Sequence, residues 1–245
     1  MGWIEPELDK GPLFEIDGKG LQSVGADSAS FHLLIIGASV AWGSYASLEK
    51  TTYFSLLEQQ LNREGHRIKI SILAAGAWIS SQEVMALLHI GFGLNPNVVL
   101  FLDGMNDITN ADEPEIDRAR QFIENMKLAG QICAGKNIDL VYALQPSIAE
   151  KKVKSKLEQR IVQTLPPTAR EQEIKKDYQR IRVALKAMKG SKIRFLDCSD
   201  VFSAEVPTTF ADLWHFADPG HQLLADFLTK FFLETYFSNE ESNKI

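Results

Sequence analysis

Short apolar runs alternate with amphipathic stretches along most of the chain. Each run is nearly continuous in apolar character, as in FHLLII and NVVLFL, and lacks the strict alternation of a strand with one face in water. Such runs are typical of strands that are buried on both faces of a sheet. We therefore predict five strands, over residues 31–36, 68–73, 97–102, 138–144 and 192–197.

The stretches between these runs have the spacing of amphipathic helices. In the segment 51–65, Phe54, Leu57 and Leu61 fall on one stripe, and Gly65 is a signal for the end of a helix. The same reasoning predicts further helices over residues 80–91, 113–134, 171–189 and 219–237.

Two of these helices have a recognisable start. Ser80 or Ser81 is the expected N-cap of the helix 80–91, because a serine side chain accepts a hydrogen bond from a free N–H group of the first turn. Asp218 is the expected cap of the last helix. Pro219 follows at the first helical position, where its missing N–H costs no hydrogen bond.

The alternation of strands and helices predicts an α/β fold. We expect a three-layer α/β/α sandwich with a mainly parallel central sheet of about five strands, formed as a single domain by residues 31–238. Residues 1–30 are polar and rich in glycine, and we expect an irregular lead-in there. Residues 150–176 are rich in Lys and Glu and contain Pro166 and Pro167, so we expect a helical excursion or a lid.

Charge and apolar content narrow the class of protein. The net charge of −6 and the pI of about 5.5 do not favour binding to nucleic acid or to an anionic membrane. No stretch approaches the roughly eighteen apolar residues of a membrane span, and the start MGWIEPELDK lacks the profile of a signal peptide. As it stands, the sequence predicts a cytoplasmic protein. If an export segment originally preceded it and has been removed, the protein is an exported or anchored one. Cys133 and Cys198 have no metal or redox spacing and are expected to be buried free thiols.

Ligands of parallel sheets bind at the carboxyl ends of the strands, so the residues after each apolar run are the first candidates for chemistry. The first run is followed by GASVAWG (37–43). This loop lacks the lysine of a phosphate loop, the spacing of a dinucleotide loop and the serine of a nucleophile elbow at Ala41. What remains is Ser39, with Gly37 before it, as either a helix cap or a nucleophile.

Two further loops follow the second and third runs. In DGMNDI (103–108), Gly104 permits a tight turn, and Asn106 is either an ordinary turn residue or a side-chain donor to a ligand. In LAAGAWISSQE (73–83), the small residues around Gly76 either pack a helix against a strand or let backbone N–H groups approach a ligand.

The segment 211–228 repeats acidic residues and histidines in steps of three, at Asp212, His215, Asp218 and His221. This spacing suits a metal site, a relay in which a carboxylate fixes the tautomer of a histidine, or a helix start. The two histidines lie on opposite sides of the predicted cap, which weakens the metal interpretation because helical zinc ligands need one regular face. His221 then has no required role.

Together these loops resemble the SGNH hydrolases, also called GDSL-type esterases and lipases, over residues 31–230. GASV (37–40) stands where that family has GDSL, DGMND (103–107) matches its G-x-N-D block, and DLWHFADPGH (212–221) matches its D-x-x-H block. There are two departures from the family pattern. Ala38 replaces the usual aspartate. In LAAGAW the alignment is ambiguous between Gly76 and its neighbour Ala77.

The resemblance implies a flavodoxin-like sheet and a catalytic triad. Ser39 would be the nucleophile, His215 the base and Asp212 the residue that orients the histidine. The backbone N–H groups of Ser39 and Gly76 and the side chain of Asn106 would form the oxyanion hole. The implied enzyme is an esterase or lipase that cleaves carboxylic esters through an acyl-serine, without a metal or organic cofactor. Its substrate would be an acyl or acetyl ester of a lipid, a carbohydrate or a small alcohol.

Other functions stay open on the same residues. An O-acyltransferase that passes an acyl group to a sugar hydroxyl would use the same set, and a non-catalytic binding protein would keep the fold without turnover. A nucleotide-binding enzyme is disfavoured because no phosphate loop is found. Acyl chain length and oligomeric state are left open. Trp42, Trp78 and Trp214 lie near the candidate residues and either line a pocket or pack in the core.

Overall fold

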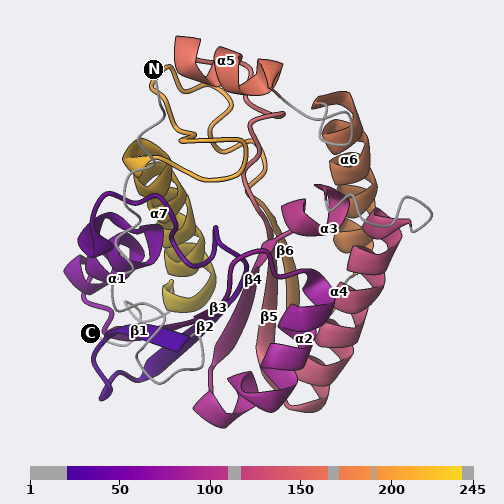
Figure 1. Cartoon of the computed structure of the whole chain (residues 1–245). Coiled ribbons are helices and arrows are strands. Elements are labelled where there is room, and N and C mark those ends of the chain that lie inside the picture. The colour runs from indigo at the N-terminus through magenta and orange to yellow at the C-terminus, as the bar shows by residue number, and fades with distance from the viewer. Residues whose placement is uncertain (1–20, 110–116, 165–170, 189, 191, 239–245) are drawn as a thin grey trace.

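A computed structural model describes residues 21–109, 117–164, 171–188, 190 and 192–238. Within these residues the chain forms one six-stranded sheet with helices on both faces (Figure 1). The strand order is β1-β3-β2-β4-β5-β6, and all neighbouring pairs are parallel except β1 with β3. The predicted α/β class with a mainly parallel central sheet is confirmed.

All five predicted strands are present, each within one residue of its predicted bounds. Counted among the parallel strands alone, their order across the sheet is second, first, third, fourth, fifth, which is the flavodoxin-like order. The chain leaves β2 for β3 on one side and returns to β4 on the other, so the carboxyl ends of β2 and β4 flank the switch point. The strands are β2 (Phe31–Gly37), β3 (Ile68–Ala74), β4 (Val98–Asp103), β5 (Asp139–Leu144) and β6 (Ile193–Asp197).

The expected irregular lead-in is wrong for its last part, where β1 (Leu21–Gly25) pairs antiparallel with β3. The segment LQSVG is short, and its one fully buried residue is the polar Gln22, so it has no apolar pattern that predicts a strand. Its hydrogen-bonding partners are supplied by the exposed edge of β3, which the local sequence does not reveal. Residues 1–20 lie outside the described residues.

The helices form the outer two layers. α1 and α7 cover one face of the sheet, and α2, α4 and α6 cover the other (Figure 1). The bounds are α1 (Tyr53–Arg63), α2 (Ser80–His89), α3 (Met105–Thr109), α4 (Arg118–Gly135), α5 (Lys156–Gln163), α6 (Glu171–Ala187) and α7 (Asp218–Phe232), with 3-10 turns at Glu49–Thr51 and Gly91–Leu94 and a π-helical turn at Leu233–Phe237.

The continuous apolar runs are explained by burial on both faces. In β2, Leu33 and Ile35 point into the core beneath α1 and α7, whereas Leu34 and Ile36 point into the core beneath α2, α4 and α6. All four side chains are fully buried. Burying such a side chain contributes about 1.5–3 kcal/mol to the free energy of unfolding. Polar substitutions on either face of these strands would therefore destabilise the fold strongly.

The predicted cap of the last helix is wrong. α7 begins at Asp218 itself, Ala217 occupies the N-cap position, and no side chain caps the helix there. The Asp218 carboxylate instead accepts hydrogen bonds from the Ser47 N–H at 2.8 Å, the Ser47 hydroxyl at 2.5 Å and the Thr51 hydroxyl at 3.1 Å. Donors from a distant loop thus replace the local N–H groups that a capping side chain would have bound.

The predicted cap of α2 is also wrong, because the serine binds a group from a distant segment. Ile79 occupies the N-cap position, and Ser80 is the first helical residue. Both the N–H and the hydroxyl of Ser80 donate to the Asp107 carboxylate, at 2.9 and 2.5 Å. The serine therefore connects α2 to α3 and does not cap its own helix.

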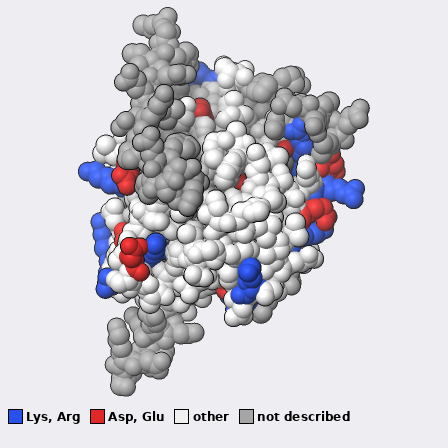
Figure 2. Space-filling view, turned by 60° about the horizontal axis from the view of Figure 1, so that its bottom comes forward, with Lys and Arg blue, Asp and Glu red and all other residues white. Residues whose placement is uncertain are grey.

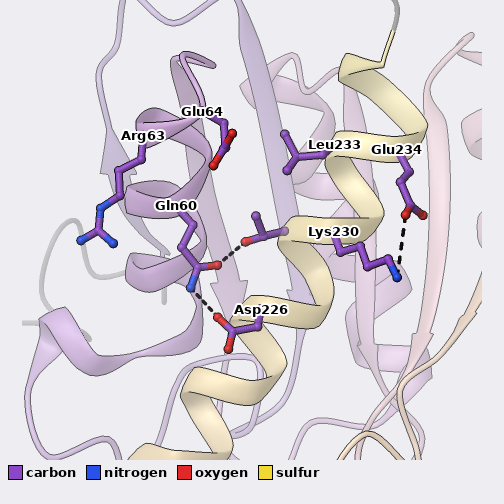
Figure 3. A pocket seen from close by; sticks show the side chains of 8 residues that line it. Gln60, Arg63, Glu64, Asp226, Lys230, Leu233 and Glu234 are labelled. Carbon is purple, nitrogen blue, oxygen red and sulfur yellow. Dashed lines mark hydrogen bonds and ion pairs between the residues drawn. The ribbon is translucent and has the colours of Figure 1, made fainter.

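A polar groove of about 460 Å³ runs between α1 and α7 (Figure 3). Gln60 of α1 bridges the two helices, because its side-chain N–H donates to Asp226 at 2.7 Å and its side-chain oxygen accepts from Thr229. Lys230 of α7 pairs with Glu234 of the π-helical turn that follows, at 3.9 Å. No residue from the strand ends lines this groove, so it is a feature of the helix pair and lies apart from the candidate site.

The described surface carries mixed charge. Figure 2 turns the lower side of Figure 1 towards the reader and shows acidic and basic side chains interspersed, mostly along the rim of the visible described surface. Cys133 and Cys198 are buried free thiols, as predicted. None of the helices in the described ranges is long and apolar enough to cross a membrane.

Gly37 closes the end of β2 against β4. A Cβ at this position would lie 2.5 Å from the backbone oxygen of Leu102 and 2.6 Å from the Cβ of Ala41. We expect Gly37→Ala to lower the free energy of unfolding by about 1–3 kcal/mol, because neither neighbour is a flexible side-chain end. Urea denaturation measures this change. Gly93→Ala is the matched control, since a Cβ there meets nothing within 4 Å. Equal stability of the two variants would contradict the close approach.

Candidate active site

The loop after β2 holds Ser39 at the carboxyl edge of the sheet. Consecutive turns close this loop, with the N–H groups of Trp42 and Ser44 donating to the backbone oxygens of Ala38 and Ser39 at 3.0 and 3.1 Å. Ser39 is half-buried. The strand end and these turns together fix the direction in which its hydroxyl points.

Asp212 and His215 lie at the tip of a hairpin formed by residues 209–217. The Ala217 N–H donates to the Thr209 oxygen, and the Ala211 N–H donates to the His215 oxygen, both at 2.9 Å. Phe210 and Phe216 form an antiparallel bridge between these two bonds. The two side chains are therefore held by a closed backbone loop, although no regular helix or strand contains them.

The structure brings Ser39, His215 and Asp212 into one hydrogen-bonded chain. The Ser39 Oγ lies 2.8 Å from the His215 Nε2, across 176 positions of sequence, and the His215 Nδ1 lies 2.7 Å from the Asp212 Oδ2. An ionised carboxylate only accepts hydrogen bonds, so Nδ1 carries the proton and Nε2 accepts from the serine hydroxyl. The tautomer that leaves Nε2 free as a base is thus selected by Asp212.

Asp212 is stabilised in its ionised form. Partial burial alone would raise the pKa of Asp212. The hydrogen bond and charge of His215, together with the N–H groups of Trp214 and His215, outweigh burial and lower this pKa below its ordinary value. Both N–H groups donate to the Asp212 Oδ1 at 2.7 Å, while Oδ2 takes the imidazole proton. Asp212 therefore stays an anion whose orientation is fixed by its own loop.

Tyr45 also contributes to this arrangement, although sequence reasoning did not select it. Its ring stacks on the His215 imidazole, with ring centroids 4.7 Å apart and planes inclined by 15°. The Tyr45 backbone has φ of 69°, in the left-handed region that L-residues rarely adopt. The only signal in the sequence is an aromatic residue soon after Ser39, and that signal does not distinguish a stacking partner from a core residue.

Donor groups converge on the same edge from three loops. Among the described residues, no group accepts a hydrogen bond from the backbone N–H of Ser39, Gly76 or Ala77. The Trp78 N–H is already used by the Ala75 oxygen at 3.3 Å. Gly76 and Ala77 are both exposed, and Ala77 has φ of 60°. Either N–H is thus left to serve a ligand.

The Asn106 side chain is positioned by the loop after β3. Its Nδ2 donates to the Trp78 oxygen at 2.8 Å, and the second N–H of this amide remains for another acceptor. Trp78 and Trp214 are half-buried beside the core under α2 and α4, which is compatible with lining a pocket. Trp42 is only 4% exposed and belongs to the opposite core, so it does not line a pocket.

Three buried carboxyl groups lie behind Asn106. Glu83, Asp103 and Asp107 are between 0% and 5% exposed, and Glu83 and Asp103 contact each other. No donor of the described residues reaches the oxygens of Glu83 or Asp103, whereas Asp107 is bound by Ser80. Burial, and then the charge of neighbouring carboxyls, raises the pKa of Glu83 and of Asp103 well above the ordinary range. Burial therefore favours the neutral form of both carboxyl groups.

His221 has a structural role that its sequence position did not predict. It is fully buried, accepts a hydrogen bond from the Tyr53 N–H at 3.3 Å and donates to the Ser44 oxygen at 3.3 Å. Burial lowers the pKa of His221 to about 4. A neutral imidazole thus joins α1, the Ser39 loop and α7.

The four residues spaced in steps of three have different partners. Asp212 binds His215, Asp218 binds Ser47, and His221 binds backbone groups. Within the described parts of the chain, no group of three or more His, Cys, Asp or Glu residues has an arrangement that suits a metal ion. The relay is the interpretation of this segment that its contacts support.

Comparison with known proteins shows a shared fold without close sequence similarity. No family model matches the sequence, and no curated protein is similar to it. An acetyl xylan esterase structure, AlAXEase, is 17% identical, with a TM-score of 0.64, over 82% of this chain and 99% of that chain. The lipase Lip_vut3 from a goat rumen metagenome is 11% identical, with a TM-score of 0.64, over 82% of this chain and 97% of that one.

A GDSL-like lipase from Bacteroides thetaiotaomicron is 14% identical, with a TM-score of 0.56, over 83% of this chain and 88% of that chain. The chain thus spans nearly the whole length of these structures. The likeness confirms the fold that the sequence resemblance implied: this is the fold of GDSL-type esterases and lipases.

The buried carboxyl pair predicts a pH-dependent stability. A carboxyl whose pKa is raised in the folded state stabilises the fold fully below its unfolded pKa, and this contribution is lost as the pH rises towards the folded pKa. Glu83→Gln removes one such group. We expect the stability of the variant to fall less than that of the wild type between pH 5 and pH 8, by at most about 1.4 kcal/mol per pH unit. Urea unfolding at both pH values measures this, and parallel slopes for the two proteins would refute it.

Proposed function

We propose that this protein is a serine hydrolase that cleaves carboxylic esters through an acyl-serine intermediate. The single observation that carries the proposal is the chain of hydrogen bonds from Ser39 through His215 to Asp212, at 2.8 and 2.7 Å. The three free N–H donors and the Asn106 amide at the same edge support it. So does the shared fold, because the structures compared include an esterase and lipases.

In the first step Ser39 acts as the nucleophile. Its Oγ attacks the carbonyl carbon of the ester while its proton passes to the His215 Nε2. The resulting imidazolium donates through Nδ1 to Asp212, which is ionised and so stabilises the positive charge. The former carbonyl oxygen becomes an oxyanion, bound by the N–H groups of Ser39 and of Gly76 or Ala77 and by the Asn106 side chain.

The second half of the reaction reverses these roles. The imidazolium gives its proton to the leaving alkoxide, and the alcohol departs from an acyl-serine. A water molecule then loses a proton to Nε2 and attacks the acyl carbon. Collapse of the second oxyanion breaks the bond between the acyl carbon and the Ser39 Oγ, which takes the proton back from Nε2, and the carboxylic acid is released. Side chains and backbone groups of the chain carry every step, so the proposal invokes no cofactor.

The substrate class is an acyl ester of a carbohydrate, a lipid or a small alcohol. The compared structures include an acetyl xylan esterase and lipases, which span this range. Half-buried Trp78 and Trp214 beside the site supply apolar surface, and that suits either a sugar ring or an acyl chain.

Ser39→Ala removes the group that forms the covalent bond. We expect hydrolysis of p-nitrophenyl acetate to fall to the rate of the uncatalysed reaction plus a small residue from the oxyanion donors, about 10³-fold or more below wild type. A fluorophosphonate probe should label the wild type at Ser39 and leave the variant unlabelled. Ser44→Ala in the same loop is the matched control, because its backbone oxygen and not its hydroxyl contacts His221.

Equal turnover by the wild type and Ser39→Ala would eliminate the nucleophile. Product analysis with and without a sugar acceptor separates hydrolysis from acyl transfer. Hydrolysis predicts free acid in both cases, whereas a transferase would form a new sugar ester.

Asn106→Ala removes one oxyanion donor. We expect kcat to fall about 10²- to 10³-fold, with KM changed little, because the bond strengthens only as negative charge develops. Steady-state kinetics on a series of aryl esters of increasing acyl chain length measure this fall in kcat. The same series shows which acyl chain length the enzyme prefers. A rise in KM at unchanged kcat would show that Asn106 binds substrate and does not stabilise the transition state.

A further inference from the structure

A buried ion pair lies outside the site, in the segment expected to be an excursion. The side chains of Lys151 and Glu158 are both 0% exposed, and the Lys151 Nζ lies 2.8 Å from each carboxylate oxygen. Lys151 follows β5, and Glu158 lies in the first turn of α5. The steps of hydrolysis described above use neither residue.

The Lys151 ammonium has a partner for each of its hydrogens. Besides Glu158, it donates to the Pro207 oxygen at 2.7 Å and to the Thr209 hydroxyl at 2.9 Å. An ammonium has three donors, so none is left unsatisfied. Two of these partners belong to the segment that enters the hairpin 209–217.

The two oxygens of Glu158 have different partners. Oε2 accepts from the Ser155 N–H at 2.8 Å, which is the local capping box of α5. Oε1 accepts from the N–H of Thr209 at 2.8 Å and of Phe210 at 3.1 Å, on the first strand of the hairpin. One carboxylate thus joins the start of α5 to the base of the hairpin.

The base of the hairpin is held on its other side as well. The Thr209 oxygen accepts from the Ala217 N–H at 2.9 Å. The backbone N–H of Thr209 is thus bound by Glu158 and its backbone oxygen by Ala217. A Cβ on Gly220 of α7 would lie 2.5 Å from the same oxygen, which shows how closely the helix packs here. Phe202, Phe210 and Phe216 stack edge to face beneath the hairpin, with ring centroids 5.1 to 5.6 Å apart.

Stability alone does not account for this ion pair. Moving two charges out of water has a large cost in free energy. Because of this cost, replacing a buried ion pair by apolar residues of similar size often leaves a protein equally stable or more stable. What apolar residues cannot supply is acceptors for the Thr209 and Phe210 N–H groups. These groups lie only a few residues before Asp212 and His215, so their placement sets the placement of the tip.

We propose that Lys151 and Glu158 are positioning residues that set the register of the hairpin 209–217 and thereby hold His215 against Ser39. The carboxylate fixes the first strand of the hairpin, and the ammonium fixes the carboxylate and the preceding carbonyl of Pro207. This inference rests on the proposed hydrolase function. It assigns α5 the role of an anchor for the site, in place of a lid.

Two variants and one control test the proposal. Glu158→Gln keeps the shape and one acceptor but removes the charge. The double variant Lys151→Met with Glu158→Leu removes both charges, so that neither is left unpaired, and leaves the two hairpin N–H groups without an acceptor. Glu150→Gln is the matched control, because Glu150 lies beside Lys151 and pairs with Arg182 of α6 at 2.7 Å, and no hydrogen bond between described residues joins its side chain to the hairpin.

We expect kcat on p-nitrophenyl acetate to fall about 10- to 100-fold in Glu158→Gln and at least as far in the double variant, with KM changed less than about threefold. Glu150→Gln should keep the wild-type kcat. Rates are measured where circular dichroism shows each variant to be folded. The low-field proton resonance of the His215 Nδ1–H should shift or broaden in both anchor variants and not in the control, which a purely structural role would not produce.

A folded double variant with the wild-type kcat and an unchanged Nδ1–H resonance would overturn the proposal. If neither anchor variant folds, Thr209→Val decides, since it removes only a hydroxyl that bonds both Lys151 and Glu158. A loss of about threefold or more in its kcat is expected, and an unchanged kcat would overturn the inference. A wild type no more active than Ser39→Ala would refute the hydrolase function instead, and the resonance would still test the anchor.

Discussion

The hydrogen bond between Ser39 and His215 is the interaction on which the rest of the site depends. It joins a loop near the front of the chain to a hairpin near its end, across 176 positions of sequence. Ser39 is directed by the end of β2 and the turns after it, whereas His215 is directed by a closed hairpin that packs on α7. A hydrogen bond tolerates errors of a few tenths of an ångström, so both supports have to be rigid.

Polar groups that are costly to bury lie behind both supports. Behind Asn106, the Asp107 carboxylate connects α3 to the start of α2, next to the buried carboxyl groups of Glu83 and Asp103. Behind the hairpin stands the Lys151–Glu158 pair. Apolar packing is non-directional, and hydrogen bonds to fixed donors select one backbone register. The directional groups are therefore concentrated behind the short helix α3, which carries Asn106, and behind the hairpin that carries His215.

The fold accommodates great divergence of sequence. The compared structures are only 11–17% identical to this chain, yet they share most of its length. A parallel sheet needs apolar residues on both faces of its strands, and many combinations of aliphatic residues meet that need. In the proposed oxyanion hole the donors are mainly backbone N–H groups, which place few demands on side chains. Ala38 and the loop LAAGAW can therefore depart from the family pattern while the loop geometry is kept.

The sequence by itself determined the five parallel strands, the helices between them and the loops that carry the candidate residues. These features follow from apolar periodicity and from the order of short motifs, which are local properties of the chain. It also indicated Ser39, Asp212, His215 and Asn106 through their positions after strands and their resemblance to a family. Strand bounds were predicted to within one residue because burial on both faces leaves little freedom in composition.

Only the tertiary structure decided the partners of polar groups. Asp218 and Ser80 were expected to cap their own helices, but donors 171 positions away and an acceptor 27 positions away bind them instead. The pairing of β1, the stacking of Tyr45 and the contacts of Glu158 are likewise set by residues from distant segments. A polar side chain satisfies whichever group the fold brings within about 3 Å, and the local sequence carries no record of which group that will be.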